Sequence, residues 1–268
     1  MGFAYQFGFI GAGNMGFAIM KGLLKVFAAE SVTFYEKDMQ RAKEVSAATG
    51  AVLAESGFAC ASSSKYVILA VKPQHLQTAV AEIAGGISAG QVFISIAPGI
   101  SAADLKGMLG ASCRVVRAMP NTPALVGEGM TGVCYDPALF SGGEQETIRS
   151  LFESFGKMVL VDEKLIDAVV CVSGSSPAYV YMFMEALADS GVKYGLPRDM
   201  AYEMAAQAVL GSAKMLLKTG EHPGRLKDQV CSPGGTTIAA VAALEEHGLR
   251  SAVMKACDAC YAKCKNIR

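Results

Sequence analysis

Short apolar runs with high β propensity alternate with stretches of helical character through the first 119 residues. The expected strands are Tyr5–Ile10, Val32–Tyr35, Tyr66–Val71, Gln91–Ile96 and Arg114–Met119, and the expected helices lie near Asn14–Phe27, Gln40–Thr49, Pro73–Ile83 and Ala102–Leu109. Alternation of this kind predicts βαβ units in a mainly parallel, doubly wound sheet.

The pattern changes after Val161. Two more expected strands, Thr131–Tyr135 and Lys157–Val161, flank a helix around Gly143–Phe155 and extend the sheet at its edge. The remaining expected helices are Lys164–Val172, Pro177–Tyr194, Arg198–Thr219, Pro223–Val230, Thr236–His247 and Leu249–Lys265. We therefore expect an α/β domain at residues 1–161 and an all-helical domain at residues 162–268.

Charged residues are scarce and balanced. The 268 residues include 24 Lys and Arg and 24 Asp and Glu, which is 18% of the chain against about 25% in a typical soluble protein. The longest charge-free stretches, Met1–Met20 and Ile83–Ala103, are interrupted by Gly and polar residues, whereas a membrane span needs about 20 apolar residues in a row. The N-terminus also lacks the basic segment of a signal peptide. These properties favour a cytoplasmic protein.

The same charge distribution indicates which partners to expect. The formal net charge is zero, so the chain lacks the basic surface on which nucleic-acid binding depends. A small-molecule partner is expected instead. Residues 168–184 carry no charge, and a helix that is apolar around its whole circumference has to be enclosed. Because the helical domain is too small to enclose it, we expect a second copy of the chain to cover it in an obligate dimer.

Eight Cys residues raise the question of disulfides or metal, and reduced thiols are expected in a chain without an export signal. Cys257, Cys260 and Cys264 form a C-x2-C-x3-C run of the kind found in zinc and iron–sulfur sites. In the expected helix, this spacing puts all three thiols on one face. We therefore interpret the run as a packing stripe of small residues and expect no metal.

The first expected strand runs directly into the sequence G-A-G-N-M-G and then into a helix. In such a strand–turn–helix, Gly11 makes the tight turn, Gly13 leaves room for a pyrophosphate, and Gly16 lets the helix approach the strand. The helix N-terminus offers N–H groups to the phosphates. The expected cofactor contacts here are Gly11, Gly13, Asn14, Met15 and Gly16. The pattern predicts a Rossmann-type domain that binds a dinucleotide.

The identity of the dinucleotide depends on the end of the second strand. Glu36 lies 20 residues beyond Gly16, where an acidic side chain can bond the 2′-hydroxyl of the adenine ribose and favour NAD. Lys37 and Arg41 follow, and they can instead neutralise the 2′-phosphate of NADP. The sequence leaves NADPH and NADH both open.

Five further blocks carry a family resemblance. They are AVKPQ at Ala70–Gln74, SIAPGIS at Ser95–Ser101, RAMPNTPALVGEG at Arg117–Gly129, SGSSPAY at Ser173–Tyr179 and DQVCSPGGTTIA at Asp228–Ala239. In order and spacing, they resemble the pyrroline-5-carboxylate reductase family. The resemblance implies that NAD(P)H reduces the C=N bond of 1-pyrroline-5-carboxylate to give L-proline, the last step of proline biosynthesis. It also implies a helical domain that interlocks in a homodimer, often assembled further into a decamer.

Further cofactor contacts follow from strand ends and from the resemblance. Lys72 and Pro73 come directly after an expected strand, where ligands of open α/β sheets bind. The resemblance implies that this loop lies along the cofactor, and Ala70 and Ala97 are assigned to the cofactor with it. Asn121 occupies the corresponding place after Met119, where it can fix the nicotinamide side or serve as a turn residue before Pro123.

A second cluster, S-P-G-G-T-T, precedes the apolar helix that begins near Ile238. Paired glycines followed by hydroxyl residues at a helix start present backbone N–H groups to one carboxylate, although plain N-capping of a surface helix has the same pattern. The resemblance implies that Thr237 bonds the ring nitrogen of the substrate, and that Ser232 and the backbone around it hold the carboxylate. Gly234, Gly235 and Thr236 are the expected substrate contacts, and Glu221 is a weaker one.

The chemistry places few demands on acid–base groups. A protonated cyclic imine is already electrophilic, so the protein mainly has to position it against the nicotinamide. His75, His222 and His247 are the three histidines, and we expect surface or capping roles for them.

Two alternatives remain at this stage. A β-hydroxyacid dehydrogenase has the same two-domain plan but needs a general base, usually a Lys, and residues 174–185 contain none. A regulatory protein that binds NAD(P) without turnover is the other.

Overall fold

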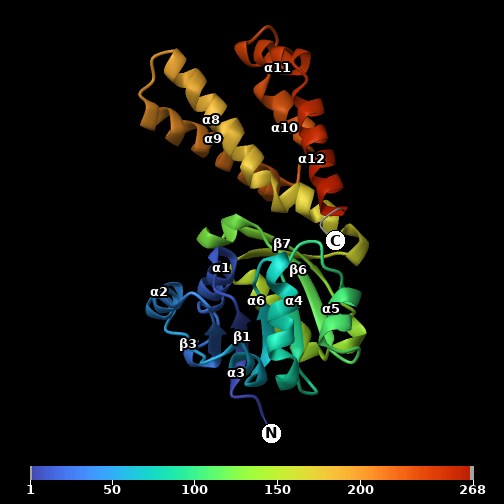
Figure 1. Ribbon diagram of the computed structural model, residues 1–268. Coiled ribbons are helices and arrows are strands. Elements are labelled where there is room, and N and C mark those ends of the chain that lie inside the picture. The colour runs from blue at the N-terminus through green and yellow to red at the C-terminus, as the bar shows by residue number, and fades with distance from the viewer. Residues whose placement is uncertain (1, 266–268) are drawn as a thin grey trace. The chain divides into compact units, whose positions relative to one another are not determined.

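The computed structural model describes residues 2–265 (Figure 1). It divides into two compact units. The first comprises the chain up to Ser175 together with the C-terminal segment from Cys260, and the second comprises Ser176–Ala259. The first contains every strand of the described chain, and the second is helical throughout its regular structure.

The first unit is built on an eight-stranded sheet in the described chain. Its strands are β1 (Tyr5–Ile10), β2 (Val32–Tyr35), β3 (Val52–Leu53), β4 (Ser64–Leu69), β5 (Val92–Ser95), β6 (Arg114–Met119), β7 (Gly129–Cys134) and β8 (Gly156–Leu160), in the spatial order β3-β2-β1-β4-β5-β6-β7-β8. All neighbours are parallel except β6 and β7. The prediction of a mainly parallel sheet is confirmed.

Strand register brings the segments after three strands together. Ile10 of β1 pairs with Tyr35 of β2 on one side and with Leu69 of β4 on the other. The residues that follow these strands, Gly11, Glu36 and Ala70, therefore lie at one edge of the sheet. This is the carboxyl edge, where open α/β sheets bind ligands.

Helices cover both faces of the sheet (Figure 1). The helices that connect or follow its strands up to β8 are α1 (Asn14–Leu23), α2 (Met39–Thr49), α3 (Gly57–Ser62), α4 (Pro73–Ile83), α5 (Ala102–Leu109) and α6 (Gly142–Glu153). Phe7 and Phe9 belong to one apolar core, whereas Ile10 and Leu69 belong to a second. Successive strand side chains point to opposite faces, so both faces are buried and the sheet is doubly wound, as predicted.

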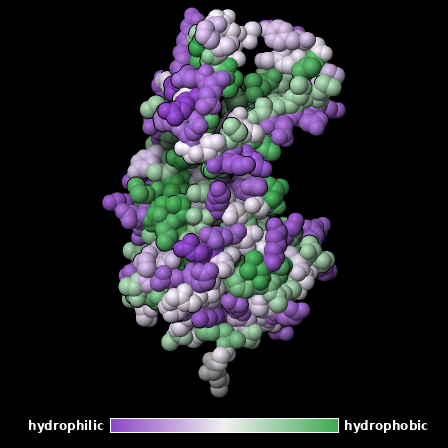
Figure 2. All heavy atoms as spheres, turned by 180° about the vertical axis from the view of Figure 1, so that it is seen from behind, coloured by the Kyte–Doolittle hydropathy of each residue, from purple (hydrophilic) through white to green (hydrophobic). Residues whose placement is uncertain are grey.

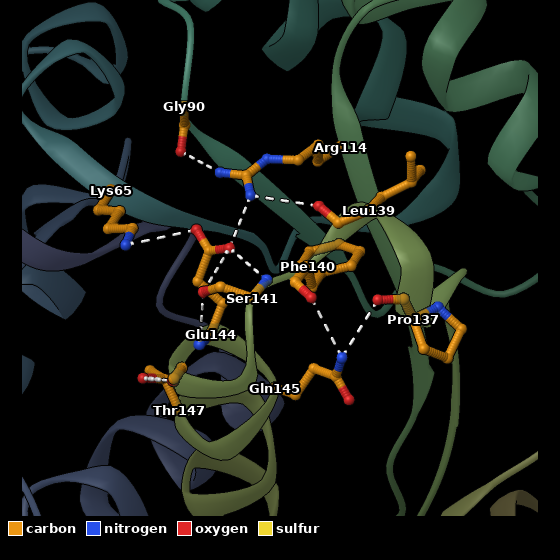
Figure 3. Close-up of polar contacts among 11 residues, drawn as sticks. Lys65, Gly90, Arg114, Pro137, Leu139, Phe140, Ser141, Glu144, Gln145 and Thr147 are labelled. Carbon is orange, nitrogen blue, oxygen red and sulfur yellow. Dashed lines mark hydrogen bonds and ion pairs between the residues drawn. The ribbon is translucent and has the colours of Figure 1, made fainter.

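A polar cluster ties the start of α6 to the opposite edge of the sheet (Figure 3). The Glu144 carboxylate lies 2.8 Å from Arg114 Nη1 and 3.4 Å from Lys65 Nζ, and it accepts the Ser141 N–H in a capping box. Burial alone would raise the pKa of Glu144, but hydrogen bonds from Arg114 and Ser141 and the charge of Arg114 lower it to about 2. The cluster is a stabilising contact of the native state.

This lowered pKa predicts how stability depends on pH. Because the pKa of Glu144 in the native state lies below its ordinary value of 4.5, the carboxylate stabilises the fold above that value. The contribution falls away as the pH drops toward about 2. Near neutral pH, a Glu144→Gln variant is expected to be about 1–3 kcal/mol less stable than the unmodified protein and to melt several degrees lower. The difference in melting temperature is expected to narrow in acid.

Thermal melts followed by circular dichroism at stepped pH test this expectation. Glu146→Gln is the matched control, because its side chain is 71% exposed and lies on the same helix. A gap between Glu144→Gln and the unmodified protein that stays constant down to strongly acidic pH would contradict the assignment.

The helical part begins with an interrupted helix. The expected helix Lys164–Val172 consists instead of a 3-10 turn at Glu163–Leu165, α7 (Ile166–Val169) and a π-helical turn, η6 (Val170–Gly174). The Ser175 N–H donates to the Val170 carbonyl at 2.8 Å, the five-residue spacing of a π turn. The sequence pattern missed this turn, because apolar periodicity does not separate α from π spacing over so few residues.

The following helices agree with prediction to within one or two residues. They are α8 (Ser176–Lys193), α9 (Arg198–Thr219), α10 (Pro223–Val230), α11 (Thr236–Glu246) and α12 (Leu249–Lys265). α8 and α9 form a hairpin through Gly195, whose φ of 97° suits glycine. The expectation of an all-helical second half is confirmed.

Large apolar side chains lie exposed on these helices. Tyr181 and Met182 of α8 are 61% and 69% exposed, and Leu217 of α9 is 68% exposed. Figure 2 shows apolar side chains open to solvent among hydrophilic ones on the helices. The buried residues of α8 and α9 are Ala188, Ala201 and Ala205, all small. The second unit therefore buries little of its own apolar surface.

One segment of the described chain, Glu163–Lys193, is long and apolar enough to cross a membrane when judged by length and composition alone. Its most apolar window has a mean hydropathy of 1.3, and 11% of that window is buried within the chain. A helix that a second subunit covers has the same properties, since it too is apolar and uncovered in a single chain.

Candidate cofactor and substrate sites

The turn after β1 has the geometry that the glycine pattern predicts. Gly11 has φ of 95°, and a Cβ there would lie 2.8 Å from the Ala70 carbonyl oxygen. A Cβ on Gly16 would lie 2.7 Å from the Gly11 carbonyl oxygen. Gly13 differs, because its φ is −62° and a Cβ would meet nothing within 4 Å. Gly11 and Gly16 are thus needed for packing, and Gly13 faces open space.

The start of α1 completes this cradle. Gly13 is the N-cap of α1, and no side chain of the described chain caps the helix. The N–H groups of its first turn therefore keep their capacity to bind an anion, and the helix dipole favours one. Asn14 and Met15 form that first turn. Open space beside Gly13 next to uncapped N–H groups fits the pyrophosphate of a dinucleotide.

A cavity of about 450 Å³ adjoins this turn at the carboxyl edge of the sheet. Its lining includes six of the residues predicted for the cofactor, which are Gly11, Gly13, Glu36, Lys37, Ala70 and Lys72. The cavity is therefore formed by segments that follow β1, β2 and β4, as the register requires.

Seven other predicted cofactor residues do not line this cavity. They are Asn14, Met15, Gly16, Arg41, Pro73, Ala97 and Asn121. Gly16 acts through packing, and Pro73 is the first residue of α4. Ala97 is 4% exposed and belongs to an apolar core. Cofactor contacts of these seven residues stay predictions.

The sequence reasoning missed one wall of the cavity. His75, Thr78, Ala79 and Glu82, all from α4, line it opposite the end of β2. Their spacing of three and four residues puts them on one helical face, continuous with Lys72. That spacing after the Lys–Pro pair is the signal from which this wall could have been found. His75 is exposed, which agrees with the expected surface role, and it also lines the cavity.

Glu36 is held at the rim of the cavity by backbone donors. The Ala12 N–H donates to Glu36 Oε2 at 2.8 Å, and the Asp38 N–H donates to Oε1 at 3.1 Å. The carboxylate therefore joins the glycine turn to the end of β2. Arg41 also contacts this turn, since its Nε donates to the Ala12 carbonyl and its guanidinium lies over the Phe17 ring.

Asn121 connects three segments within the first unit. Its Nδ2 donates to the Ser173 carbonyl of the π turn at 2.9 Å, and its Oδ1 accepts the Met130 N–H of β7 at 2.9 Å. Asn121 as a whole residue is 8% exposed. Asn121 is therefore a positioning residue in this structure, and one Nδ2 hydrogen and one Oδ1 lone pair are left for the predicted contact with nicotinamide.

The candidate substrate cluster lies at the start of α11 in the second unit. Its N-cap is Gly235, with no capping side chain in the described chain, so the alternative of plain Ser or Thr capping is wrong. Gly234 has φ of 67°, and a Cβ on Gly235 would lie 2.3 Å from Ser232 Oγ. The glycines thus bring the Ser232 hydroxyl against the helix start. The N–H groups of Thr236 and Thr237 begin an uncapped helix of 11 residues, suited to one carboxylate.

The predictions for Glu221, His222 and His247 have different outcomes. Glu221 accepts a hydrogen bond from Gln229 Nε2 at 3.1 Å, which places it beside α10, and its contact with substrate stays a prediction. The expected capping role of His222 is confirmed, because its Nδ1 accepts the Gly224 N–H at the start of α10. His247 Nδ1 lies 2.9 Å from the Ala243 carbonyl at the end of α11.

The cysteine run lies on α12, as expected. Cys264 is 5% exposed; burial and the neighbouring Cys260 raise the pKa of its thiol to about 11. Cys260 Sγ lies 3.3 Å from Ser175 Oγ. Within residues 2–265, no three His, Cys, Asp or Glu side chains are grouped so as to hold a metal ion.

Comparison with known proteins covers both parts of the chain. Residues 163–267 match the family model described as pyrroline-5-carboxylate reductase dimerisation, and residues 6–99 match the model described as NADP oxidoreductase, coenzyme F420-dependent. The pyrroline-5-carboxylate reductase of Escherichia coli (strain K12) is 44% identical over 265 residues, which is 98% of each chain. That of Arabidopsis thaliana is 40% identical over 94% of this chain and 92% of the other.

Solved structures agree. A pyrroline-5-carboxylate reductase from Coxiella burnetii superimposes with a TM-score of 0.90 at 30% identity, covering 98% of both chains. The Plasmodium falciparum pyrroline carboxylate reductase with NADP bound gives a TM-score of 0.87 at 31% identity, covering 99% of both chains. Because these matches span nearly the whole chain at 30% identity or more, the chain belongs to the pyrroline-5-carboxylate reductase family of NAD(P)H-dependent oxidoreductases.

Proposed function

We propose that this chain reduces the C=N bond of 1-pyrroline-5-carboxylate with NAD(P)H and so forms L-proline, the last step of proline biosynthesis. The observation that supports this most is the match to enzymes of that name over 98% of the chain. The chain also has both chemical requirements, an anion-binding turn for the dinucleotide and an uncapped helix start for a carboxylate.

The first unit holds the dinucleotide in this proposal. The N–H groups that open α1, beside the open space at Gly13, bind the pyrophosphate, and Glu36 faces the adenine ribose. Lys72 and the exposed face of α4 form the opposite wall. When bound, NAD(P)H supplies the hydride.

The second unit binds the substrate in this proposal. The N–H groups of Thr236 and Thr237, with the Ser232 hydroxyl, hold the carboxylate that substrate and product share. The Gly235 N–H is not available for this contact, because it donates to the Ser232 carbonyl at 3.0 Å. The hydroxyl of Thr237 bonds the ring nitrogen and fixes the orientation of the imine. Glu221 is the candidate for a further contact with that nitrogen.

The chain needs no strong general base for this reaction. The protonated imine carries its own positive charge, and the amine formed from it takes a proton readily from water. What the residues supply is orientation and exclusion of water, and alignment of this kind is worth several orders of magnitude in rate. This agrees with the local roles of His222 and His247 at helix ends.

In the cell, the chain is a cytoplasmic homodimer formed through residues 162–268, with residues 1–161 as the dinucleotide-binding domain. Dimers of this kind assemble further into a decamer. The exposed apolar side chains of α8 and α9 support the dimer, since they have no cover within the described chain. We expect sedimentation of dilute protein to give a dimer and dissociation to be accompanied by loss of helicity. A stable, folded monomer at nanomolar concentration would contradict an obligate dimer.

Steady-state assays test the activity. Oxidation of NADH and of NADPH is followed with 1-pyrroline-5-carboxylate, and reduction of NAD⁺ and NADP⁺ is followed with a panel of 3-hydroxy acids. Oxidation that depends on the imine supports the proposal. Turnover of a hydroxy acid without turnover of the imine would favour the β-hydroxyacid dehydrogenase alternative, and binding without any turnover would favour a regulatory role.

A further inference from the structure

We infer that Glu36 makes this chain select NADH over NADPH; the inference rests on the proposed function, and it decides between cofactors that the family relationship leaves open. Two structural observations carry it. The Glu36 carboxylate is fixed where the adenine ribose would lie, and the two basic side chains that follow it along the chain are engaged by acceptors of the protein itself.

The first observation is the fixed position of the carboxylate. Its two oxygens each accept one backbone hydrogen bond, from Ala12 at 2.8 Å and from Asp38 at 3.1 Å. A carboxylate has about four lone-pair sites, so two remain for the ribose hydroxyl groups. Because both bonds come from backbone, the side chain cannot swing away without leaving two N–H donors unpaired. A 2′-phosphate would have to approach this fixed negative charge.

The second observation concerns Lys37 and Arg41, the residues that could neutralise such a phosphate. Lys37 Nζ lies 2.8 Å from Glu82 Oε1. Glu82 belongs to α4 and lines the same cavity. Arg41 Nε donates to the Ala12 carbonyl at 3.1 Å, and its Nη1 pairs with Glu44 at 3.3 Å. The guanidinium also lies over the Phe17 ring, 4.8 Å from its centroid. Lys37 lines the cavity beside the Glu82 carboxylate, which offsets its charge, and Arg41 does not line the cavity.

The charged groups that line the cavity near the proposed ribose position are mostly negative. Three carboxylates, those of Glu36, Asp38 and Glu82, line the cavity, against the single ammonium of Lys37 at this end. Lys72 also lines the cavity, but it follows β4, and β1 lies between β4 and β2 in the sheet. A 2′-phosphate adds a charge of about −2 at neutral pH. It is repelled by the carboxylates, whereas the 2′-hydroxyl of NAD donates to one of them.

Calorimetric titration of the full-length protein with NAD⁺ and with NADP⁺, without imine, tests the inference independently of turnover. NAD⁺ is expected to bind at least about 10-fold more tightly, a difference of about 1.4 kcal/mol. Glu36→Gln keeps the shape of the side chain but removes its charge, and is expected to reduce the ratio of the two dissociation constants by about 10-fold. Glu36→Ser, which has a shorter side chain, is expected to change the ratio in the same direction.

Two control variants separate the alternatives. Glu30→Gln removes an exposed carboxylate that precedes β2, at the far end of that strand, and should leave the ratio unchanged. Lys37→Ala should weaken NADP⁺ no more than NAD⁺. Tighter binding of NADP⁺ than NAD⁺, a ratio that Glu36→Gln leaves unchanged, or a selective loss of NADP⁺ binding in Lys37→Ala would each overturn the inference.

Failure of the proposed function gives a different result. A protein that binds NAD⁺ selectively and does not reduce the imine retains the specificity of Glu36 and loses the proposed reaction. A protein that binds neither dinucleotide overturns both.

Discussion

A Gly13→Val variant is expected to fold normally and to bind NAD⁺ and NADP⁺ at least about 100-fold more weakly than the unmodified protein, a loss of about 3 kcal/mol. A Cβ at residue 13 meets nothing within 4 Å, so the new side chain has room in the protein alone. That room is the space proposed for the pyrophosphate, beside the uncapped start of α1. The isopropyl group would occupy it and keep the phosphates from the N–H groups.

In this variant, we expect dinucleotide binding to be lost and the thermal stability of the protein to be unchanged. Calorimetric titration measures the first and thermal melting the second. Gly107→Val in α5 is the matched control, since a Cβ there also meets nothing within 4 Å and the residue is distant in sequence from the turn. Gly11→Val is unsuitable, because φ of 95° and the Ala70 carbonyl at 2.8 Å make any side chain there destabilising. Normal dinucleotide affinity in Gly13→Val would remove this turn from the cofactor site.

A Thr237→Val variant is expected to lose about 100-fold in kcat/KM for the imine while its affinity for the dinucleotide changes less than about twofold. Valine preserves the branched shape and removes only the hydroxyl, which is the group proposed to bond the ring nitrogen. The helix start is preserved, because the N-cap is the backbone of Gly235 and Thr237 provides no cap.

Thr237→Ser and Thr236→Val are the controls for this prediction. The first keeps a hydroxyl and should retain most of the activity. The second removes the neighbouring hydroxyl, and the proposal assigns only the backbone N–H of Thr236 to the substrate. Steady-state kinetics with varied imine, together with dinucleotide titration, separate the two effects. Equal losses in Thr236→Val and Thr237→Val, or unchanged kinetics in Thr237→Val, would exclude a specific role for the Thr237 hydroxyl.

Local patterns predicted much of the fold. The strands β1, β2 and β6 begin and end where the apolar runs do, and α8 to α12 follow the helical periodicity closely. The missed elements are short. β3 has two residues and α3 has six, and neither length gives a hydrophobic pattern its characteristic period. The antiparallel direction of β7 was also outside the reach of the sequence, because strand direction depends on the path of the connecting loop.

The candidate sites divide in the same way. Glycines that serve a conformation or a close approach, such as Gly11 and Gly16, are legible in sequence because no other residue fits there. The α4 wall with His75 and Glu82 was missed, because its relation to Glu36 comes from packing across the sheet edge. Asn121 illustrates the converse. Its place after a strand indicated a ligand contact, but both polar atoms of its side chain bond the protein.

The sequence by itself determined the two-part architecture, the glycine turn, the apolar helical surface and the family, because each depends on residue type and spacing along the chain. Only the tertiary structure decided the charge around the end of β2, where the adenine ribose is proposed to bind. Glu36, Lys37 and Arg41 are neighbours in sequence, and their order left both cofactors open. Glu82 is 45 residues from Lys37, and Ala12 is 24 residues from Glu36. These distant partners determine which charges still face the cavity, since a paired cation contributes little to a ligand that must first displace its partner.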